Sequence, residues 1–249
     1  MFDETIEGKN PVLEALRAGR EINKIFIADT ARDKAIMQIK QLAKENKIPV
    51  QMTAKEKIEE LADTKKHQGV IAMASAKQYV ELEEIMARET GQLPLIVMVD
   101  GLEDPHNLGA IIRTCEAVGV QGVVIPNRRN VGLTFIVSKV SAGAIEHIPV
   151  ARVVNLVQTM VTLKENGYWI VGCEASADET IYEADFDMPI VLVIGGEGKG
   201  IGRLVREHCD FLVKLPMLGK VNSLNASVAA SVCLYEILRK RKYNPKYKK

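Results

Sequence analysis

Continuous apolar runs in the second part of the chain constrain its fold more than any other feature. They lie at 95–100 (LIVMVD), 122–126 (GVVIP), 168–175 (YWIVGCEA), 190–195 (IVLVIG) and 211–216 (FLVKLP). Unbroken runs of this length, rather than alternating ones, are typical of strands buried on both faces of a parallel sheet. Helical patterns at 108–118, 153–166 and 224–241 separate most of them. This alternation predicts a doubly wound, mostly parallel α/β domain from residue 94 onward.

The last predicted helix, 224–241, has an apolar stripe at the 3–4 spacing of a buried helix face. The stripe comprises Leu224, Val228, Ser231, Val232, Tyr235 and Leu238. Ala226, Ala229 and Ala230 make the first turns of this helix thin. A thin helix allows close approach by a sheet, a ligand or another subunit.

Residues 1–76 are predicted to form a separate, smaller α/β unit. Strands are expected at 22–28, 48–53 and 69–75, and helices at 11–18, 34–46 and 55–62. Asn10 is a suitable N-cap for the first helix, with Pro11 at its first position. The polar segment 77–93 ends near Gly91 and precedes a proline, so it is predicted to be an interdomain linker that contains a short helix.

Charge and cysteine usage exclude several classes of protein. With 33 Lys and Arg against 32 Asp and Glu the net charge is +1, so any basic surface must be local. The tail 239–249 (RKRKYNPKYKK) is such a segment, and it fits either a solvated terminus or a phosphate-contacting arm. The four cysteines are widely spaced and form no CxxC pair, which disfavours a disulfide framework and a metal site. No signal peptide and no membrane-length apolar run is found, so a cytoplasmic location is expected.

Polar turns follow the apolar strands at 104–109 (DPHNLG), 195–200 (GGEGKG) and 222–225 (NSLN). Open α/β sheets bind ligands at the carboxyl ends of their strands. Because all of these turns are expected at that edge, the sequence predicts that they form one ligand site.

The GGEGKG turn is similar to two phosphate-binding loops but matches neither. A P-loop needs a Ser or Thr after its lysine, whereas Gly200 follows Lys199. The dinucleotide fingerprint needs a glycine where Ile201 stands, and it normally opens the first βα turn of the domain. ATP and NAD are therefore disfavoured. A flexible loop with Glu197 at its centre remains, in which backbone amides can approach a ligand closely; a solvated glycine turn is the alternative.

Each turn also has a purely structural interpretation. Asn107, and either Ser223 or Asn225, are suited to cap the helices that follow them. Arg113 and Glu116 are three residues apart on a predicted helix and could form a surface ion pair. The coincidence of the turns nevertheless favours a functional site.

Together these segments resemble a known family. DGLEDPHNLGAIIRTCEAVGV, LVIGGEGKGIG and LPMLGKVNSLNASVAASVCLYE are similar, in this order, to the motifs of the SpoU (TrmH-type) branch of the SPOUT methyltransferases. At the front of the chain, IEGKNPVLEALRAG and HQGVIAMAS resemble the L30e-like substrate-binding domain of the 23S rRNA guanosine-2'-O-methyltransferases of this branch. The resemblance covers essentially the whole chain.

The resemblance implies an S-adenosylmethionine-dependent enzyme that methylates the ribose 2'-hydroxyl of a guanosine in 23S rRNA or its large-subunit precursor. It implies an L30e-like RNA substrate-binding domain at 1–76, a linker at 77–93 and a SpoU-type methyltransferase domain at 94–249. A C-terminal trefoil knot and a homodimer are expected from the family alone, since knots are rare exceptions to the rules of chain connection. Neither a metal nor a membrane is implied.

The resemblance also assigns roles to individual residues. The catalytic set comprises Asn107, Arg113, Glu197, Ser223 and Asn225. The cofactor-binding set comprises Gly195, Gly196, Leu215, Met217 and Leu224. Contact with RNA in the first domain is assigned to Gly8, Asn10 and His67, for which a turn glycine, a helix cap and a strand-edge histidine are equally good interpretations. The chain departs from the family pattern at Gly196, where Ser or Ala is common, and at Ala226, where Val is common.

Arg113 corresponds to the family's proposed base. A guanidinium is effectively always protonated, so Arg113 could instead bind the substrate phosphate and polarise the hydroxyl. The proton would then pass to water or to a phosphate oxygen. Asn107 and Glu197 are expected to hold Arg113 and the ribose in place.

Two other functions stay open from the sequence. A tRNA ribose methyltransferase of the same branch is disfavoured by the first domain, because the simplest tRNA enzymes of this branch have short terminal extensions instead. A non-catalytic RNA-binding factor for ribosome assembly is disfavoured by the intact polar set.

Overall fold

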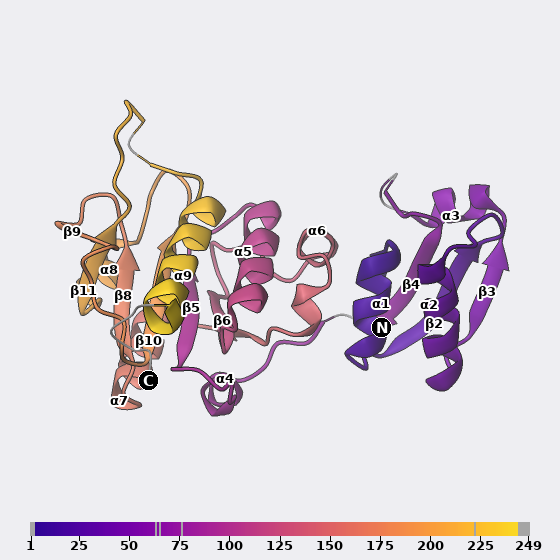
Figure 1. Ribbon diagram of the computed structural model, residues 1–249, viewed down its shortest axis with the longest axis horizontal. Helices are drawn as coiled ribbons and strands as arrows, with labels where there is room; N and C mark the ends of the chain where they lie inside the picture. The colour runs from indigo at the N-terminus through magenta and orange to yellow at the C-terminus, as the bar shows by residue number, and fades with distance from the viewer. Residues whose placement is uncertain (1–2, 63, 65, 76, 222, 244–249) are drawn as a thin grey trace. The chain divides into compact units, whose positions relative to one another are not determined.

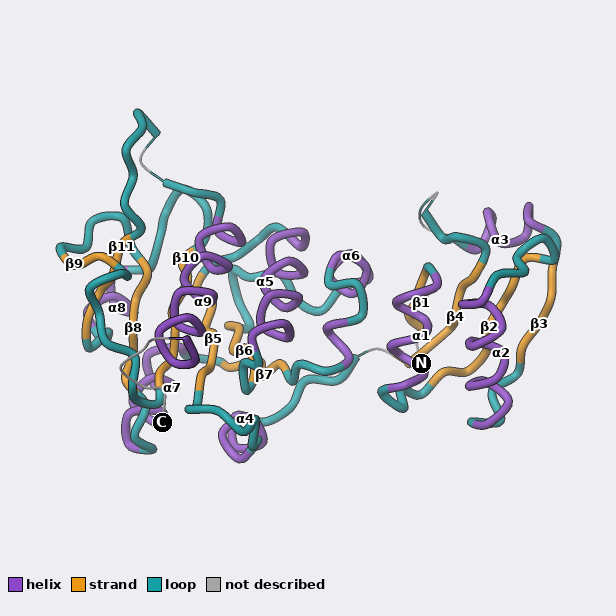
Figure 2. Tube along the Cα trace, in the orientation of Figure 1, coloured by secondary structure: helices purple, strands orange, loops and turns teal. Residues whose placement is uncertain are grey.

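The computed structural model describes residues 3–62, 64, 66–75, 77–221 and 223–243 (Figures 1 and 2). They form two compact units. The first contains the residues up to Gln78 together with Leu133–His147, and the second contains Tyr79–Gly132 and Ile148 onward. The sequence prediction had placed 133–147 within the methyltransferase domain, whereas in the structure this segment belongs to the first unit.

The sheet of the first unit has the strand order β1-β4-β2-β3. Its strands are β1 (Asp3–Glu7), β2 (Ile22–Ala28), β3 (Val50–Thr53) and β4 (Val70–Ser75). β4 pairs antiparallel with β1 and β2, and β2 pairs parallel with β3. Of these, β1 has no counterpart among the predicted strands. The helices α1 (Lys9–Arg17) and α2 (Lys34–Glu45) share a core with the sheet, and Ile58 of α3 (Lys55–Leu61) packs with Ile71 and Ala28.

Helix α1 begins earlier than the sequence predicts. Its N-cap is Gly8, and Asn10 lies within the helix, so the prediction of Asn10 as the cap is wrong. Gly8 has φ +98°, a conformation that residues with a side chain rarely adopt. Its N–H donates to Val70 O at 3.2 Å. The glycine thus allows the chain to turn directly from β1 into the helix.

Buried ion pairs hold the segment 133–147 in the first unit. This segment contains α6 (Phe135–Val140) and the 3-10 helix η1 (Ala144–Glu146). Lys139 Nζ donates to Glu7 Oε2 at 3.1 Å, and Arg20 donates to Glu146 at 2.5 Å. The side chains of Glu7 and Glu146 are only 0% and 2% exposed. These pairs join residues more than a hundred positions apart, so no local sequence pattern announces them.

The second unit contains a sheet with the strand order β7-β6-β5-β10-β8-β11-β9, in which each described pairing is parallel. Its strands are β5 (Leu95–Asp100), β6 (Gly122–Pro126), β7 (Val150–Val153), β8 (Trp169–Cys173), β9 (Glu179–Thr180), β10 (Ile190–Gly195) and β11 (Phe211–Lys214). The predicted α/β class with a mostly parallel sheet is confirmed. The short strands β7 and β9 were not predicted, because four and two residues carry little periodic signal.

Helices cover both faces of this sheet. On one face, α4 (Leu82–Ala87), α7 (Leu156–Glu165) and α8 (Arg203–Glu207) contribute Ile85, Met160 and Val205 to a core with the strands. On the other face, α5 (Pro105–Val118) and α9 (Ala226–Tyr243) lie side by side (Figure 1). The hydroxyl oxygens of Thr114 and Ser231 are 2.9 Å apart between them. The segment 77–93, predicted as a linker, contributes the fully buried Ile85 to this unit.

The apolar stripe predicted to be the buried face of the last helix is largely exposed. Val228, Val232 and Tyr235 are 48%, 38% and 53% exposed. The buried residues of α9 are Ala226, Ala230, Cys233, Leu234, Glu236 and Ile237. The inward face of α9 combines small side chains near its start with Leu234 and Ile237 further along, and it packs against the sheet and α5. The prediction of the buried face is therefore wrong, and the reversal leaves an apolar surface uncovered.

Part of the basic tail is structural. Arg241 donates hydrogen bonds to the carbonyls of Leu93, Phe186 and Met188 at 2.6–2.9 Å. Burial lowers its pKa to about 10. The tail was interpreted either as a solvated terminus or as a phosphate-contacting arm, and the partly buried Arg241 fits neither interpretation. Residues 244–249 lie outside the described residues. Of the helices in the described ranges, none combines the length and apolarity needed to cross a membrane. The trefoil knot stays a prediction.

Candidate functional site

The polar turns of the sequence meet at the carboxyl edge of neighbouring strands. GGEGKG begins where β10 ends, DPHNLG follows β5 beside it, and the segment before α9 follows β11. Parallel strands bring these ends to one edge of the sheet. The register of the central pair places Gly195 directly beside Asp100.

The glycines of the 195–200 loop are required by close backbone packing. A Cβ on Gly195 would lie 2.1 Å from the carbonyl carbon of Gly200, and one on Gly196 would lie 2.0 Å from Gly101 O. In this chain, therefore, the Ser or Ala that is common at position 196 would require the backbone to move. Asp100 fixes both ends of the loop, since its carbonyl accepts from Gly196 N and its carboxylate from Gly202 N, both at 2.8 Å.

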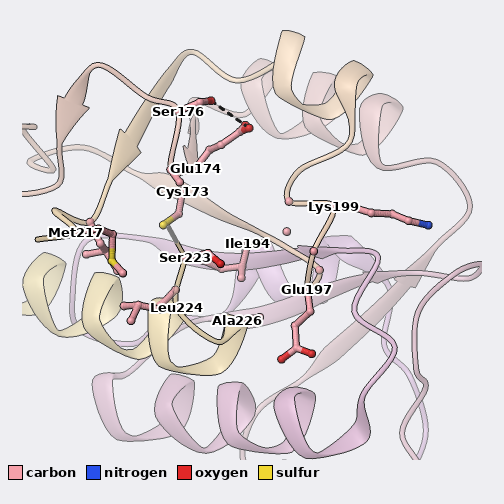
Figure 3. A pocket seen from close by; sticks show the side chains of 17 residues that line it. Cys173, Glu174, Ser176, Ile194, Glu197, Lys199, Met217, Ser223, Leu224 and Ala226 are labelled. Atoms are coloured by element: carbon pink, nitrogen blue, oxygen red, sulfur yellow. Dashed lines mark hydrogen bonds between the residues drawn. The ribbon is translucent and has the colours of Figure 1, made fainter. Parts of the chain in front are cut away.

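A hydrogen-bonded triad of side chains joins the turns. Glu197 Oε1 accepts from Asn107 Nδ2 at 2.8 Å and from Asn225 Nδ2 at 2.6 Å. Asn225 Nδ2 also lies 3.0 Å from Asn107 Oδ1, to which it donates. Figure 3 shows the Glu197 carboxylate pointing from its loop toward the helices. The structure thus brings together three of the predicted catalytic residues, one from each turn.

Asn225 also caps the last helix. Its Oδ1 accepts from Ser227 N at 3.0 Å and from Val228 N at 3.3 Å, while its Nδ2 points to Glu197. Of the two predicted caps, Ser223 and Asn225, the second makes the capping bonds. Because the oxygen and nitrogen of the amide have different partners, the amide orientation is fixed by the fold. Asn222, at the start of this turn, lies outside the described residues.

Asn107 is not the cap of its helix, contrary to the sequence prediction. Helix α5 begins at Pro105, and Asp104 is the N-cap, accepting from His106 N at 2.8 Å. This hydrogen bond lowers the pKa of the Asp104 carboxyl below its usual value. Asn107 is consequently a buried residue of the first turn, and its amide is available to Glu197.

Arg113 lies apart from this triad. Six residues along an α-helix correspond to about 240° of rotation, so Arg113 and Asn107 lie on different faces of α5. Arg113 is exposed, and within the described residues it has no hydrogen-bond or ion-pair partner, Glu116 included. The expectation that Asn107 and Glu197 hold Arg113 is thus not met in this structure, because both are bound to Asn225 instead.

A cavity of about 400 Å³ opens beside the triad (Figure 3). All the predicted cofactor-binding residues line it: Gly195, Gly196, Leu215, Met217 and Leu224. Glu197 and Ser223 line it as well. The sequence prediction missed the wall that follows β8, formed by 173–176. That strand ends at the same sheet edge, and this is the signal from which the wall could have been predicted.

Two thiols lie at the border of the cavity. Cys173, which lines it, and the buried Cys233 of α9 have sulfur atoms 3.3 Å apart. The hydrogen bond from Cys233 lowers the pKa of the Cys173 thiol, and the same bond together with burial raises the pKa of Cys233. Within the described part of the chain, no group of three or more His, Cys, Asp or Glu side chains is placed to hold a metal ion.

The predicted RNA-contacting residues are in the first unit. His67 is 7% exposed and its Nδ1 accepts from Gly69 N at 3.1 Å, so it has a structural role there. It also lines a hollow of about 830 Å³ together with Lys9, Arg32 and Lys55. Gly8 is the buried cap described above, and Asn10 is exposed on α1. Asp33 and Glu59 line the same hollow and pair with Lys9 and Lys55, and Asn10 lies outside it.

Comparison of the chain with known proteins identifies its family and several similar proteins. The SpoU rRNA Methylase family model matches residues 94–235, and a model described as RNA 2'-O ribose methyltransferase substrate binding matches residues 5–80. The Bacillus subtilis (strain 168) protein named "Putative TrmH family tRNA/rRNA methyltransferase YacO" is 51% identical over 94% of each chain.

Among solved structures, the SpoU methyltransferase AviRb from Streptomyces viridochromogenes, in complex with the cofactor AdoMet, superposes with a TM-score of 0.81 at 25% identity. It covers 96% of this chain and 91% of its own. The A. aeolicus TrmH/SpoU tRNA modifying enzyme has a TM-score of 0.56 at 32% identity, and it covers 67% of this chain and 83% of its own.

Proposed function

Because this chain belongs to the SpoU rRNA methylase family, we propose that it methylates the ribose 2'-hydroxyl of a guanosine in the 23S rRNA of the large ribosomal subunit. The chain is an RNA methyltransferase of the SpoU/TrmH type that uses S-adenosylmethionine, and the proposal concerns its substrate and the methylated position. The observation that carries the proposal is the triad of Glu197, Asn107 and Asn225 beside a cavity at the carboxyl edge of the sheet.

The residues of the cavity fit S-adenosylmethionine. Its walls combine the backbone of Gly195 and Gly196 with the apolar side chains of Leu215, Met217 and Leu224. The glycine backbone would approach the polar atoms of the cofactor closely, and the apolar side chains would cover its base. A side chain at either glycine would meet the loop at about 2 Å, so the backbone wall is a built feature of the chain.

Bound S-adenosylmethionine supplies a methyl group that is already activated, so the protein must align the hydroxyl and share its proton. Glu197 has one carboxylate oxygen occupied by two amides, whereas its Oε2 accepts no hydrogen bond within the described residues. We assign Oε2 to the ribose hydroxyl. Asn107 and Asn225 hold the carboxylate in place, and Ser223 at the cavity wall is assigned to the substrate phosphate or the cofactor carboxylate.

Arg113 is assigned to substrate phosphate rather than to proton removal, because its guanidinium stays protonated. Arg113→Ala is expected to abolish methyl transfer while the dissociation constant of S-adenosylmethionine stays within about twofold. Arg203→Ala is the control, since Arg203 is exposed and lies outside the cavity. Turnover of the Arg113 variant within tenfold of wild type would remove Arg113 from the mechanism.

The substrate itself is tested by mapping ribose methylation in total RNA from cells with and without the gene. Loss of one mark in large-subunit rRNA is the expected result, and loss of a tRNA mark would overturn the proposal. The match of residues 5–80 to a substrate-binding model supports the assignment of the first unit to RNA recognition, including Gly8, Asn10 and His67. The presence of this substrate-binding region also distinguishes the chain from the A. aeolicus tRNA modifying enzyme, which covers only 67% of it. The intact triad disfavours a non-catalytic assembly factor.

We further propose a homodimer that covers the exposed apolar stripe of α9. Val232, Tyr235 and Tyr243 line a groove of about 700 Å³ there. Tyr235→Glu is expected to shift the protein from dimer to monomer in light scattering, because it places a charge in an apolar contact. A wild-type protein that is monomeric at assay concentration would refute the dimer. The rRNA substrate supports a cytoplasmic location.

A further inference from the structure

A second hollow, of about 480 Å³, lies against the GGEGKG loop. It shares Gly196, Glu197, Lys199 and Gly200 with the cofactor cavity. Its other walls are the start of α5 and the loop that follows β6. Asn107 lines the second hollow but not the cofactor cavity, so the Glu197–Asn107 hydrogen bond lies where the two spaces adjoin.

Unpaired cations gather in this hollow. Arg128 and Arg129 from the loop after β6, and Lys199 from the GGEGKG loop, are exposed and line it. Among the residues that the structure describes, none of these cations has a hydrogen-bond or ion-pair partner. Of the acids that line the same hollow, Asp100 and Asp104 accept backbone N–H bonds, Glu197 accepts from two amides, and Glu103 is exposed. The hollow therefore offers cationic side chains that form no ion pair with the carboxylates lining it, within the described residues.

The arginine-bearing loop is held in a defined conformation. Asn130 Oδ1 accepts from Leu102 N, and Leu102 O accepts from Val131 N, both at 2.8 Å. Asn127 N donates to Val153 O at 2.9 Å at the other end of the loop. Arg129 has φ +56°, which is uncommon for a residue with a side chain and costs on the order of 1 kcal/mol. A loop fixed at both ends that retains such a residue is preorganised rather than random.

We propose that this second hollow receives the acceptor nucleotide of the RNA, with Arg128 and Arg129 binding the phosphates that flank it. The inference rests on the proposed function. Donor and acceptor must meet at a shared wall, and Glu197 is on the wall common to both spaces. Arginine binds phosphate oxygens through two parallel N–H bonds, which would orient the backbone as well as attract it. None of the sequence motifs includes these arginines.

The test compares Arg128→Ala/Arg129→Ala with wild-type protein in binding to full-length large-subunit rRNA transcript across 50 to 200 mM salt. Each lost phosphate contact reduces the magnitude of the slope of log affinity against log salt by about 0.7 to 0.9. Loss of two contacts should therefore reduce it by about 1.4 to 1.8 and weaken binding at least tenfold. The affinity for S-adenosylmethionine should stay within about twofold, because the arginines do not line the cofactor cavity. Arg203→Ala is the matched control, and thermal melts verify that every variant is folded.

A charge-preserving pair, Arg128→Lys/Arg129→Lys, separates simple attraction from oriented binding. It should retain most of the salt slope while methylation at subsaturating RNA still falls several-fold, since lysine lacks the paired donors. The inference would be overturned if the alanine variant bound RNA with unchanged affinity and unchanged salt slope. It would also be overturned if the variant lost affinity for S-adenosylmethionine instead of affinity for RNA. Failure of the proposed function is distinguishable: wild type would then leave no 2'-O-methyl mark on the transcript, whatever the binding comparison shows.

Discussion

Two glutamates of this chain, Glu146 and Glu197, have opposite surroundings: one is buried in an ion pair and the other is exposed and bound by amides. Glu146 in the first unit is 2% exposed and is neutralised by Arg20 and Lys77. Glu197 in the second unit is exposed, and its described partners are the neutral amides of Asn107 and Asn225. A buried carboxylate needs a paired cation, whereas an open one held by amides keeps its charge available to a ligand. Enclosure and partner type therefore distinguish the structural ion pair of Glu146 from the carboxylate that we propose for catalysis, Glu197.

The largest expected effect is on stability, from Glu146→Ala. The change leaves Arg20 buried without its carboxylate and should lower the free energy of unfolding by about 3 kcal/mol. Urea titration followed by circular dichroism measures it. Glu60→Ala, in an exposed pair of the same unit, is the control and should change stability little. Equal effects of the two changes would contradict the comparison.

Glu197→Gln should lower activity and leave stability nearly unchanged, the opposite of what is expected for Glu146→Ala. Glutamine keeps an oxygen that can accept from both amides but loses the charge, so methyl transfer should fall about 100-fold with little change in the melting temperature. Steady-state kinetics with saturating S-adenosylmethionine measures the rate. If stability falls as much as it does for Glu146→Ala, Glu197 is a structural residue.

Asn225→Asp sharpens the comparison within one side chain. The aspartate keeps an oxygen for the α9 cap, where the helix dipole favours it, but replaces the donor to Glu197 with a second negative charge. Activity should fall about 30-fold, the equivalent of about 2 kcal/mol for a hydrogen bond to a charged group, while the melt is unchanged. Asn225→Ser retains a capping hydroxyl without the added charge and should lose less activity. A large loss of stability in the aspartate variant would show that capping is the dominant role.

Met217→Ala should have the smallest effect. Met217 is partly buried and lines the cavity that we propose for S-adenosylmethionine. Its truncation should weaken cofactor binding about tenfold, or about 1.4 kcal/mol, without altering RNA affinity. Calorimetric titration measures this. Leu218→Ala is the adjacent control, since that side chain is 101% exposed. Equal affinities for the two variants would exclude Met217 from the cofactor wall.

Prediction from sequence succeeded for several strands of both sheets. The bounds expected for β2, β5, β6 and β10 agree with those of the structure. The last three are apolar runs buried almost throughout, whereas β2 also contains Asn23 and Lys24. It failed for α9, where two apolar stripes, one with Val228 and Val232 and one with Ala230 and Leu234, both have helical spacing. Helical spacing cannot decide between them, because the choice depends on how closely α5 and the sheet approach the helix.

The site shows the same division. The turns that carry Asn107, Glu197 and Asn225 were predictable, because strand ends of a parallel sheet share an edge. The wall after β8 was missed, although that strand ends at the same edge. The binding of Asn107 and Glu197 to Asn225 was not predictable, nor was the hollow beside Arg128 and Arg129. Those features depend on helix rotation and on loops that meet only in three dimensions.

The sequence by itself determined the α/β class, the longer strands of the parallel sheet and the polar turns at their ends, since apolar runs and turn chemistry are local properties of a chain. Only the tertiary structure decided which partner each polar group takes. It put 133–147 into the first unit through ion pairs between distant residues, and it gave Glu197 two amides instead of a cation. The energy of an ion pair or hydrogen bond depends on the distance between the groups and on the exclusion of water, and neither can be predicted from the sequence alone.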